Sequence, residues 1–189
     1  TSSNALGTSA GTGTSSVNVL SGGALSINAG GLNNPNTITI AGTGLSATQN
    51  AALYITGIAA TLSNPILVSA DSRIYSTVTT AFNGTINSSG GNFNLLMHNT
   101  TGNFTFGAAI GTPAASFNSF SVSAPNGTLS FSSTIQLTAG NVGGGTSTFI
   151  SGGNITFNNS ISKDGANTEF ILMRADYNGT GTGTVIFNA

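Results

Sequence analysis

Short runs of alternating apolar and polar residues recur along this chain, and one run is found three times in nearly the same form. The copies are GNFTFGAAI from Gly102, GTLSFSSTI from Gly127 and GNITFNNSI from Gly153, at spacings of 25 and 26 residues. In each copy one polar residue separates the first two apolar residues, so both point to the same face of an extended strand. The pattern predicts a short, half-buried β-strand in each copy.

The fixed spacing predicts that these strands stack on one another. Sequence repeats of about 20 to 50 residues are typical of solenoids, in which each unit covers the apolar face of the next. We therefore expect an all-β, parallel β-solenoid with roughly 25 residues per turn. Its predicted core ladder contains Phe104, Leu129 and Ile155 at the first apolar position, Phe106, Phe131 and Phe157 at the second, and Ile110, Ile135 and Ile161 at the third.

Weaker strand patterns indicate that residues 1–189 form a single solenoid segment with two or three strands per turn. Thr37–Ala41, Phe120–Val122 and Phe170–Met173 are examples, and turn-forming residues separate them. No helix is expected. The best helical window, Ser46–Ile58, lacks a sustained 3.6-residue period and is interpreted as an irregular excursion.

The last residues repeat the motif once more without completing it. GTVIFNA, from Gly183, matches the first seven positions, with Val185 and Phe187 at the apolar sites. We expect Val185, Ile186 and Phe187 to form an assembly edge, because an unpaired strand presents free backbone donors and acceptors. The segment is accordingly expected to belong to a longer repetitive chain or filament.

Charge is scarce, which restricts the classes of partner. Charged residues make up 4% of the chain and the formal net charge is −1, compared with about 25% charged residues in ordinary globular proteins. With no basic patch to neutralise phosphates, we predict no nucleic-acid partner. Apolar residues are too scattered for a membrane helix, so no membrane insertion of this segment is expected. The charged residues are Arg73, Lys163, Arg174, Asp71, Asp164, Glu169 and Asp176.

Three segments in the first half resemble autotransporter-associated β-strand repeats of bacterial surface proteins: Val17–Ile27, Thr37–Gly44 and Pro65–Ile74. Phe170–Asp176, followed by Tyr177–Gly181, is similar to rungs of filamentous-haemagglutinin-like adhesins. Both resemblances imply a right-handed parallel β-helix and an extracellular or cell-surface location. Neither resemblance transfers a catalytic residue.

Candidate chemistry is sparse. His98 is the only histidine, and no nucleophile-elbow motif accompanies it, so we expect no enzyme activity and place His98 at a solvated strand end or corner. Asp71 and Arg73 share one face of a strand and are expected to mark no site. No cofactor is expected. A weak calcium hypothesis rests on the Asp-x-Asn start of oxygen-ligand loops, with Asp164, Asp176 and Asn178 as the candidate ligands.

Three functional classes follow from these observations. The first is a non-catalytic structural or adhesive module of a secreted or cell-surface fibrous protein. The second is a self-assembling filament subunit, whose partners are further copies or neighbouring repeats of the same protein. The third is an ice- or glycan-binding solenoid, in which Tyr54, Tyr75 and Tyr177 are the candidate exposed rings for host or surface glycans.

Overall fold

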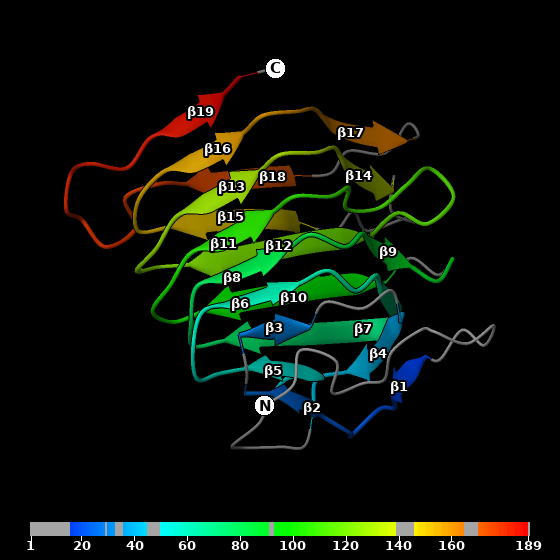
Figure 1. Ribbon diagram of the computed structural model, residues 1–189. Coiled ribbons are helices and arrows are strands. Elements are labelled where there is room, and N and C mark those ends of the chain that lie inside the picture. Colours follow the sequence, from blue (N-terminus) through cyan, green and yellow to red (C-terminus); the bar gives the residue numbers. More distant parts are fainter. Residues whose placement is uncertain are drawn as a thin grey trace.

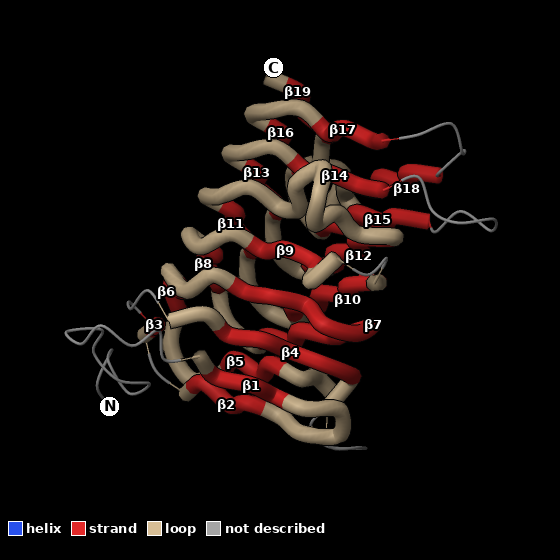
Figure 2. Tube along the Cα trace, turned by 90° about the vertical axis from the view of Figure 1, so that its right-hand side faces the viewer, coloured by secondary structure: helices blue, strands red, loops and turns tan. Residues whose placement is uncertain are grey.

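The computed structural model describes residues 16–28, 30–32, 36–44, 50–90, 93–138, 146–164 and 170–188. These ranges contain strands and turns and no helix. All strand pairs among them are parallel. The chain winds into a stack of rungs (Figures 1 and 2), which confirms the predicted all-β, parallel solenoid.

Three faces enclose the core. The face that we call the Phe face is a seven-stranded sheet, and its strands in chain order are β3 (Gly31–Leu32), β6 (Ala60–Leu62), β8 (Thr80–Phe82), β11 (Phe104–Phe106), β13 (Leu129–Phe131), β16 (Ile155–Phe157) and β19 (Val185–Phe187). The face that we call the long face contains β2 (Leu25–Ile27), β5 (Leu53–Ile55), the second half of β7 (Ile66–Ser76), β10 (Asn94–Asn99), β12 (Ser119–Ala124), β15 (Thr146–Ser151) and β18 (Phe170–Arg174).

The third face is the most irregular. Its strands are β1 (Val17–Val19), β4 (Ile38–Gly42), the first half of β7, β9 (Ile86–Ser88), β14 (Ile135–Thr138) and β17 (Ile161–Asp164). Single bridges at Ile110 connect β9 to β14. Three strands per turn is the upper value that the sequence predicted.

The register of the Phe face confirms the predicted core ladder. Phe104 pairs with Leu129, which pairs with Ile155, and Phe106 pairs with Phe131, which pairs with Phe157. All six side chains are buried. Ile110, Ile135 and Ile161 are likewise in register on the third face. The turn length is 25 residues from Phe104 to Leu129 but ranges from 20 residues, between Ala60 and Thr80, to 30, between Ile155 and Val185.

Stacked phenylalanine rings form the centre of the core. Five rings follow one another up the Phe face, with centroid separations of 4.8–5.5 Å and planes within 15° of parallel. Rings from the long face pack edge-on against this column, as Phe149 does against Phe131 at 5.5 Å and 89°. Parallel in-register pairing places identical side chains directly above one another, so the repeat itself produces the stack. The five rings are those of Phe82, Phe106, Phe131, Phe157 and Phe187.

At Gly102 and Gly127, which begin two of the motif copies, the corners of successive rungs are too close for a side chain. A Cβ atom at Gly127 would lie 2.1 Å from the carbonyl oxygen of Gly102, far inside van der Waals contact. The same corner one rung later is joined by a hydrogen bond from the Gly153 N–H to the Gly127 carbonyl at 2.9 Å. A side chain at Gly127 would therefore separate two rungs that must stay hydrogen-bonded.

One predicted feature of the first half was wrong. The window Ser46–Ile58 is not an irregular excursion throughout, because Leu53–Ile55 is β5, paired with β2 on one side and β7 on the other. Leu53 and Ile55 are buried and Tyr54 between them is partly exposed, which is the alternation of a strand with one face in the core. Residues 46–49 of this window lie outside the described residues.

Candidate functional site

The outward side chains of the long face are aligned in columns. Along β7, Asp71, Arg73 and Tyr75 point outward and alternate with the buried Ser72 and Ile74. The parallel register extends each column onto β10 and β12. Asp71 is followed by Asn94 and Ser119, Arg73 by Leu96 and Ser121, and Tyr75 by His98 and Ser123.

A β-bulge bends β7 where these columns begin. Between the register pairs Ile40–Val68 and Gly42–Ser72, β4 contributes one residue and β7 contributes three. The hydroxyl of Ser69 donates to the Ile40 carbonyl at 3.2 Å and links the bulged segment to β4, while the Ser72 hydroxyl donates to the Ala70 carbonyl at 2.7 Å within the bulge. Such bulges bend a strand and redirect a side chain. Here the bend carries β7 from the third face to the long face (Figure 2) and leaves Asp71 exposed at the corner.

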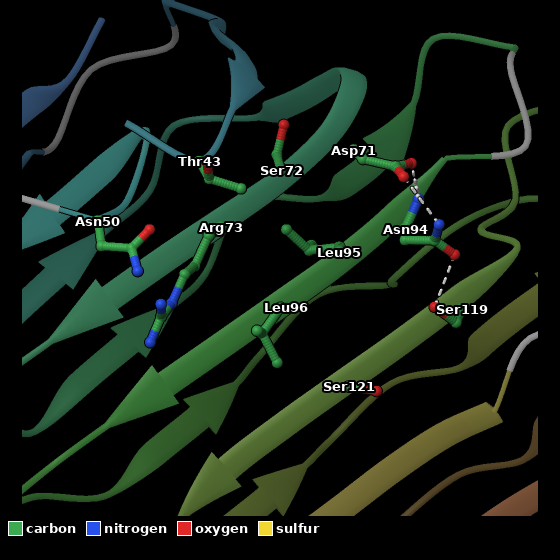
Figure 3. A pocket seen from close by; sticks show the side chains of 10 residues that line it. All are labelled: Thr43, Asn50, Asp71, Ser72, Arg73, Asn94, Leu95, Leu96, Ser119 and Ser121. Carbon is green, nitrogen blue, oxygen red and sulfur yellow. Dashed lines mark hydrogen bonds between the residues drawn. The ribbon is translucent and has the colours of Figure 1, made fainter. Parts of the chain in front are cut away.

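A groove of about 490 Å³ lies beside this bend. It crosses β7, β10 and β12, so three successive rungs contribute to one surface (Figure 3). A volume of this size is within the range of small-molecule sites, about 300–1,000 Å³. Its lining combines one carboxylate, one guanidinium, two amides and several hydroxyls with two leucines: Thr43, Asn50, Asp71, Ser72, Arg73, Asn94, Leu95, Leu96, Ser119 and Ser121.

Hydrogen bonds fix one wall of the groove. The Asn94 backbone N–H donates to Asp71 Oδ1 at 2.8 Å and its side-chain Nδ2 donates to Asp71 Oδ2 at 3.0 Å. Asn94 Oδ1 in turn accepts from Ser119 Oγ at 2.7 Å and from Asn118 Nδ2 at 2.8 Å. Figure 3 shows this series of hydrogen bonds crossing three strands from Asp71 to Ser119. The polar groups of this wall are thus held in place before any ligand arrives.

Arg73 forms the opposite wall, and no ion pair to it is found among the described residues. In the amide orientation that satisfies both neighbours, Asn50 Oδ1 accepts from Arg73 Nη1 at 2.8 Å while Nδ2 donates to the Thr43 carbonyl at 3.3 Å. The Arg73 Nε is buried without a hydrogen-bond partner in the described part of the chain. Its guanidinium carbon lies 5.8 Å from the centroid of the Tyr75 ring. The guanidinium is therefore positioned by neutral groups, and no carboxylate among the described residues neutralises its charge.

Next to Arg73, three aromatic rings follow one another along the third column. The Tyr54 and Tyr75 rings are 5.2 Å apart and within 5° of parallel, and Tyr75 is followed by His98 at 5.6 Å and 33°. The flanking residues in register are small, Ser26 before Tyr54 and Ser123 after His98. The outer ring faces of the stack are consequently bordered by serine side chains.

His98 is the penultimate residue of β10, so its predicted place near a strand end is confirmed. The expectation that it is solvated was wrong, because its side chain is half-buried against Tyr75. Burial lowers the pKa of His98 below its usual value of 6.5, and the nearby positive charge of Arg73 lowers it further. The imidazole is therefore uncharged at neutral pH.

The predicted assembly edge, Val185, Ile186 and Phe187, is β19, the last strand of the Phe face. β19 pairs on one side with β16, and the Phe187 ring stacks on Phe157 at 5.1 Å and 15°. On its other side the structure describes no strand, and Phe187 is 59% exposed. The column of stacked rings thus ends in an open ring face.

On the long face, the last described strand, β18, also leaves a core-side residue exposed. Ile171 is in register with the buried Ser147, and Met173 with the buried Phe149, so both point toward the core side. Ile171 is nevertheless 42% exposed, because no further rung covers it among the described residues. Leu172, between them, points to the outer surface. Exposed apolar side chains therefore lie on the last described strand of each of these two faces, β18 and β19.

Two of the three calcium candidates are engaged in one turn. Both carboxylate oxygens of Asp176 accept from the Gly181 N–H, at 2.8 and 2.9 Å, and Oδ1 also accepts from Thr180 Oγ1 at 3.2 Å. Asn178 Oδ1 accepts from the same Thr180, at 3.3 Å from the N–H and 3.1 Å from Oγ1. These oxygens serve as acceptors within the turn that follows β18.

Asp164 is not near them. It is the last residue of β17 and pairs with Thr138, whereas the turn containing Asp176 connects β18 to β19 on the opposite side of the solenoid (Figure 1). The structure therefore does not bring the three candidates together. Over the described ranges, no group of three or more His, Cys, Asp or Glu side chains is placed to hold a metal ion.

Comparisons with known proteins add no family to this description. No protein-family model, no curated protein and no solved structure matches the chain. In the part of the chain that the structure describes, no helix has the length and apolar character needed to cross a membrane.

The groove is the feature that sequence reasoning missed. Asp71 and Arg73 do share one face, as expected, but they do not pair with each other; the carboxylate binds Asn94, 23 residues away in sequence. The sequence signal was present in the alternation of residues 71–75 and in the polar residues one rung later. It was not decisive, because the bulge that sets the register between β4 and β7 has no distinctive residue pattern.

Proposed function

We propose that this solenoid is a non-catalytic structural or adhesive segment of a secreted or cell-surface fibrous protein. The observation that carries the proposal is the continuous column of phenylalanine rings through successive rungs, from Phe82 to Phe187. In a core of this kind each rung adds its own contribution to the stability of the stack. Such a stack can act as a stiff spacer. The resemblance of its strands to autotransporter-associated repeats supports the same role and an extracellular location.

A second function, self-assembly into a filament, is favoured by the exposed edge at β18 and β19. Phe187 and Ile171 lie on the core side yet remain largely uncovered. A rung of the same geometry would cover both residues and pair with the free backbone groups of β19. That rung would come either from a neighbouring repeat of a longer chain or from a second copy of this segment.

Localisation tests the first proposal. Antibodies against the native solenoid should label intact producing cells, or the surrounding matrix, as strongly as permeabilised cells. Labelling that requires permeabilisation would overturn the extracellular assignment.

Electron microscopy separates the two functions. Isolated short rods from the purified 189-residue segment favour a spacer within a longer chain. Regular filaments favour the assembling subunit. The variant Phe187→Lys places a charge on the core side of the edge and should abolish filaments, whereas Leu172→Lys, on the outer surface of β18, should leave them intact. Amorphous aggregates with no repeating axial spacing would contradict assembly through the edge.

A further inference from the structure

We propose that the groove beside the bend of β7 binds an acidic oligosaccharide, with Arg73 receiving a sugar carboxylate and the wall formed by Asp71, Asn94 and Ser119 receiving sugar hydroxyls. Binding at the groove is a property of the isolated solenoid and is independent of its structural role. The binding proposal can therefore be wrong while the structural function is right, and the structural function can be wrong while the binding proposal is right.

The guanidinium supplies the first part of the argument. Arg73 is held by the neutral amide of Asn50, its Nε is buried without a partner, and no carboxylate of the described residues forms an ion pair with it. Arg73 is partly exposed, so an incoming acceptor meets its accessible guanidinium donors and not the enclosed Nε. A carboxylate is the acceptor whose two oxygens match the fork of guanidinium donors. The uncompensated guanidinium thus favours an anion with planar, two-oxygen geometry.

The charge balance favours a single carboxylate over a phosphate. Asp71 lies two residues from Arg73 and points to the same side of β7, so the groove as a whole carries one positive and one negative group. A doubly charged phosphate would meet repulsion from Asp71, while a singly charged carboxylate at Arg73 is balanced. The formal net charge of −1 for the chain adds no field that would attract a polyanion.

The wall formed by Asp71, Asn94 and Ser119 indicates that the rest of the ligand is a sugar chain. Amide and hydroxyl groups on three consecutive rungs present both donors and acceptors, as the hydroxyls of a carbohydrate require. Successive rungs are about 4.8 Å apart, which is comparable with the length of one pyranose unit. Leu96, which follows Arg73 in the same column and is 43% exposed, offers an apolar surface to the C–H groups of a sugar ring.

Isothermal titration calorimetry with 3′-sialyllactose, a trisaccharide that carries a single carboxylate, tests the proposal, and 3′-galactosyllactose serves as the neutral match. We expect saturable binding of 3′-sialyllactose to the wild-type segment and at least about ten-fold weaker binding of 3′-galactosyllactose. Absence of 3′-sialyllactose binding at millimolar concentration overturns the proposal. Equal affinity for the two trisaccharides overturns the role of Arg73 as a carboxylate receptor.

Variants locate the binding. Arg73→Gln should weaken 3′-sialyllactose binding at least about ten-fold, while Arg174→Gln, which changes the other arginine on the long face, should not alter it. Leu96→Glu keeps the exposed β10 position but introduces a like charge in the groove, and it should also abolish binding of 3′-sialyllactose. Unchanged thermal unfolding of each variant shows that the fold is retained. Equal losses in Arg73→Gln and Arg174→Gln would overturn the assignment to this groove.

Discussion

Phe106 and Phe131 stack with their ring centroids 4.8 Å apart and their planes within 1° of parallel. The two residues are separated by one full turn of the solenoid, since they are register partners on β11 and β13. Phe131 also contacts Phe157 above it and, edge-on, Phe120 and Phe149 from the long face. One ring thus joins three rungs and two faces.

Phe131→Ala is expected to lower the free energy of unfolding by about 3–5 kcal/mol, because it leaves a cavity between fixed neighbours. Phe187→Ala is the matched control, since its ring stacks on one side alone and is 59% exposed. Phe187→Ala should therefore lower the free energy of unfolding clearly less than Phe131→Ala does. Urea denaturation of both variants measures the difference, and equal losses would show that the column is not a continuous stabilising unit.

Gly127→Ala is expected to destabilise the solenoid by at least about 1–3 kcal/mol, because the added methyl would meet the Gly102 carbonyl oxygen in the adjacent corner. Gly153→Ala is the control at the next corner. There the nearest atom is a side-chain methyl of Thr128 at 3.0 Å, which can move more easily than backbone. Thermal unfolding of the two variants should show a larger loss of stability for Gly127→Ala than for Gly153→Ala. A Gly127→Ala protein as stable as the wild type would exclude backbone contact between corners as the reason for the repeated glycine.

Stability is expected to fall as the pH drops below the unfolded-state pKa of His98, about 6.5. The folded pKa of His98 is lowered, first by burial and second by Arg73, so the unfolded chain binds the proton more readily. Its contribution is therefore complete above about pH 6.5 and is lost through the range between the unfolded and folded pKa values. Thermal unfolding midpoints measured from about pH 8 down to about pH 5 should record this loss of stability. His98→Asn should flatten this part of the profile, and an unchanged profile would assign the dependence to other groups.

Asp176→Ala is expected to destabilise the turn after β18, since Asp176 accepts hydrogen bonds from Gly181 and Thr180 and has a φ of 56°, which alanine adopts at a cost of about 1–2 kcal/mol. Asp176→Asn should lose less, because asparagine tolerates this φ and keeps one acceptor oxygen. Thermal unfolding with calcium or with a chelator should give equal midpoints for the wild type, because the turn already engages these oxygens. A calcium-dependent increase that Asp176→Asn removes would instead support the calcium hypothesis.

The repeat was sufficient to predict the ladder but not the lateral path of the chain between copies. Residues such as Phe104, Leu129 and Ile155 recur at nearly constant spacing, and parallel stacking is the arrangement that covers all of them at once. The β5 segment was missed because three alternating residues, Leu53–Ile55, are too short to outweigh the surrounding alanines and threonines. Its partners on β2 and β7 are what stabilise it as a strand.

The sequence by itself determined the fold class, the identity of the core ladder and the scarcity of charge, because these depend on periodicity and composition. Only the tertiary structure decided that Asp71 meets Asn94, that Arg73 donates to Asn50, and that the rings of Tyr54, Tyr75 and His98 follow one another in a row. Each of these contacts joins different rungs and depends on the register between them. Around Asp71 and Arg73 a bulge of two extra residues sets that register, and a shift of one residue would turn every outward side chain inward.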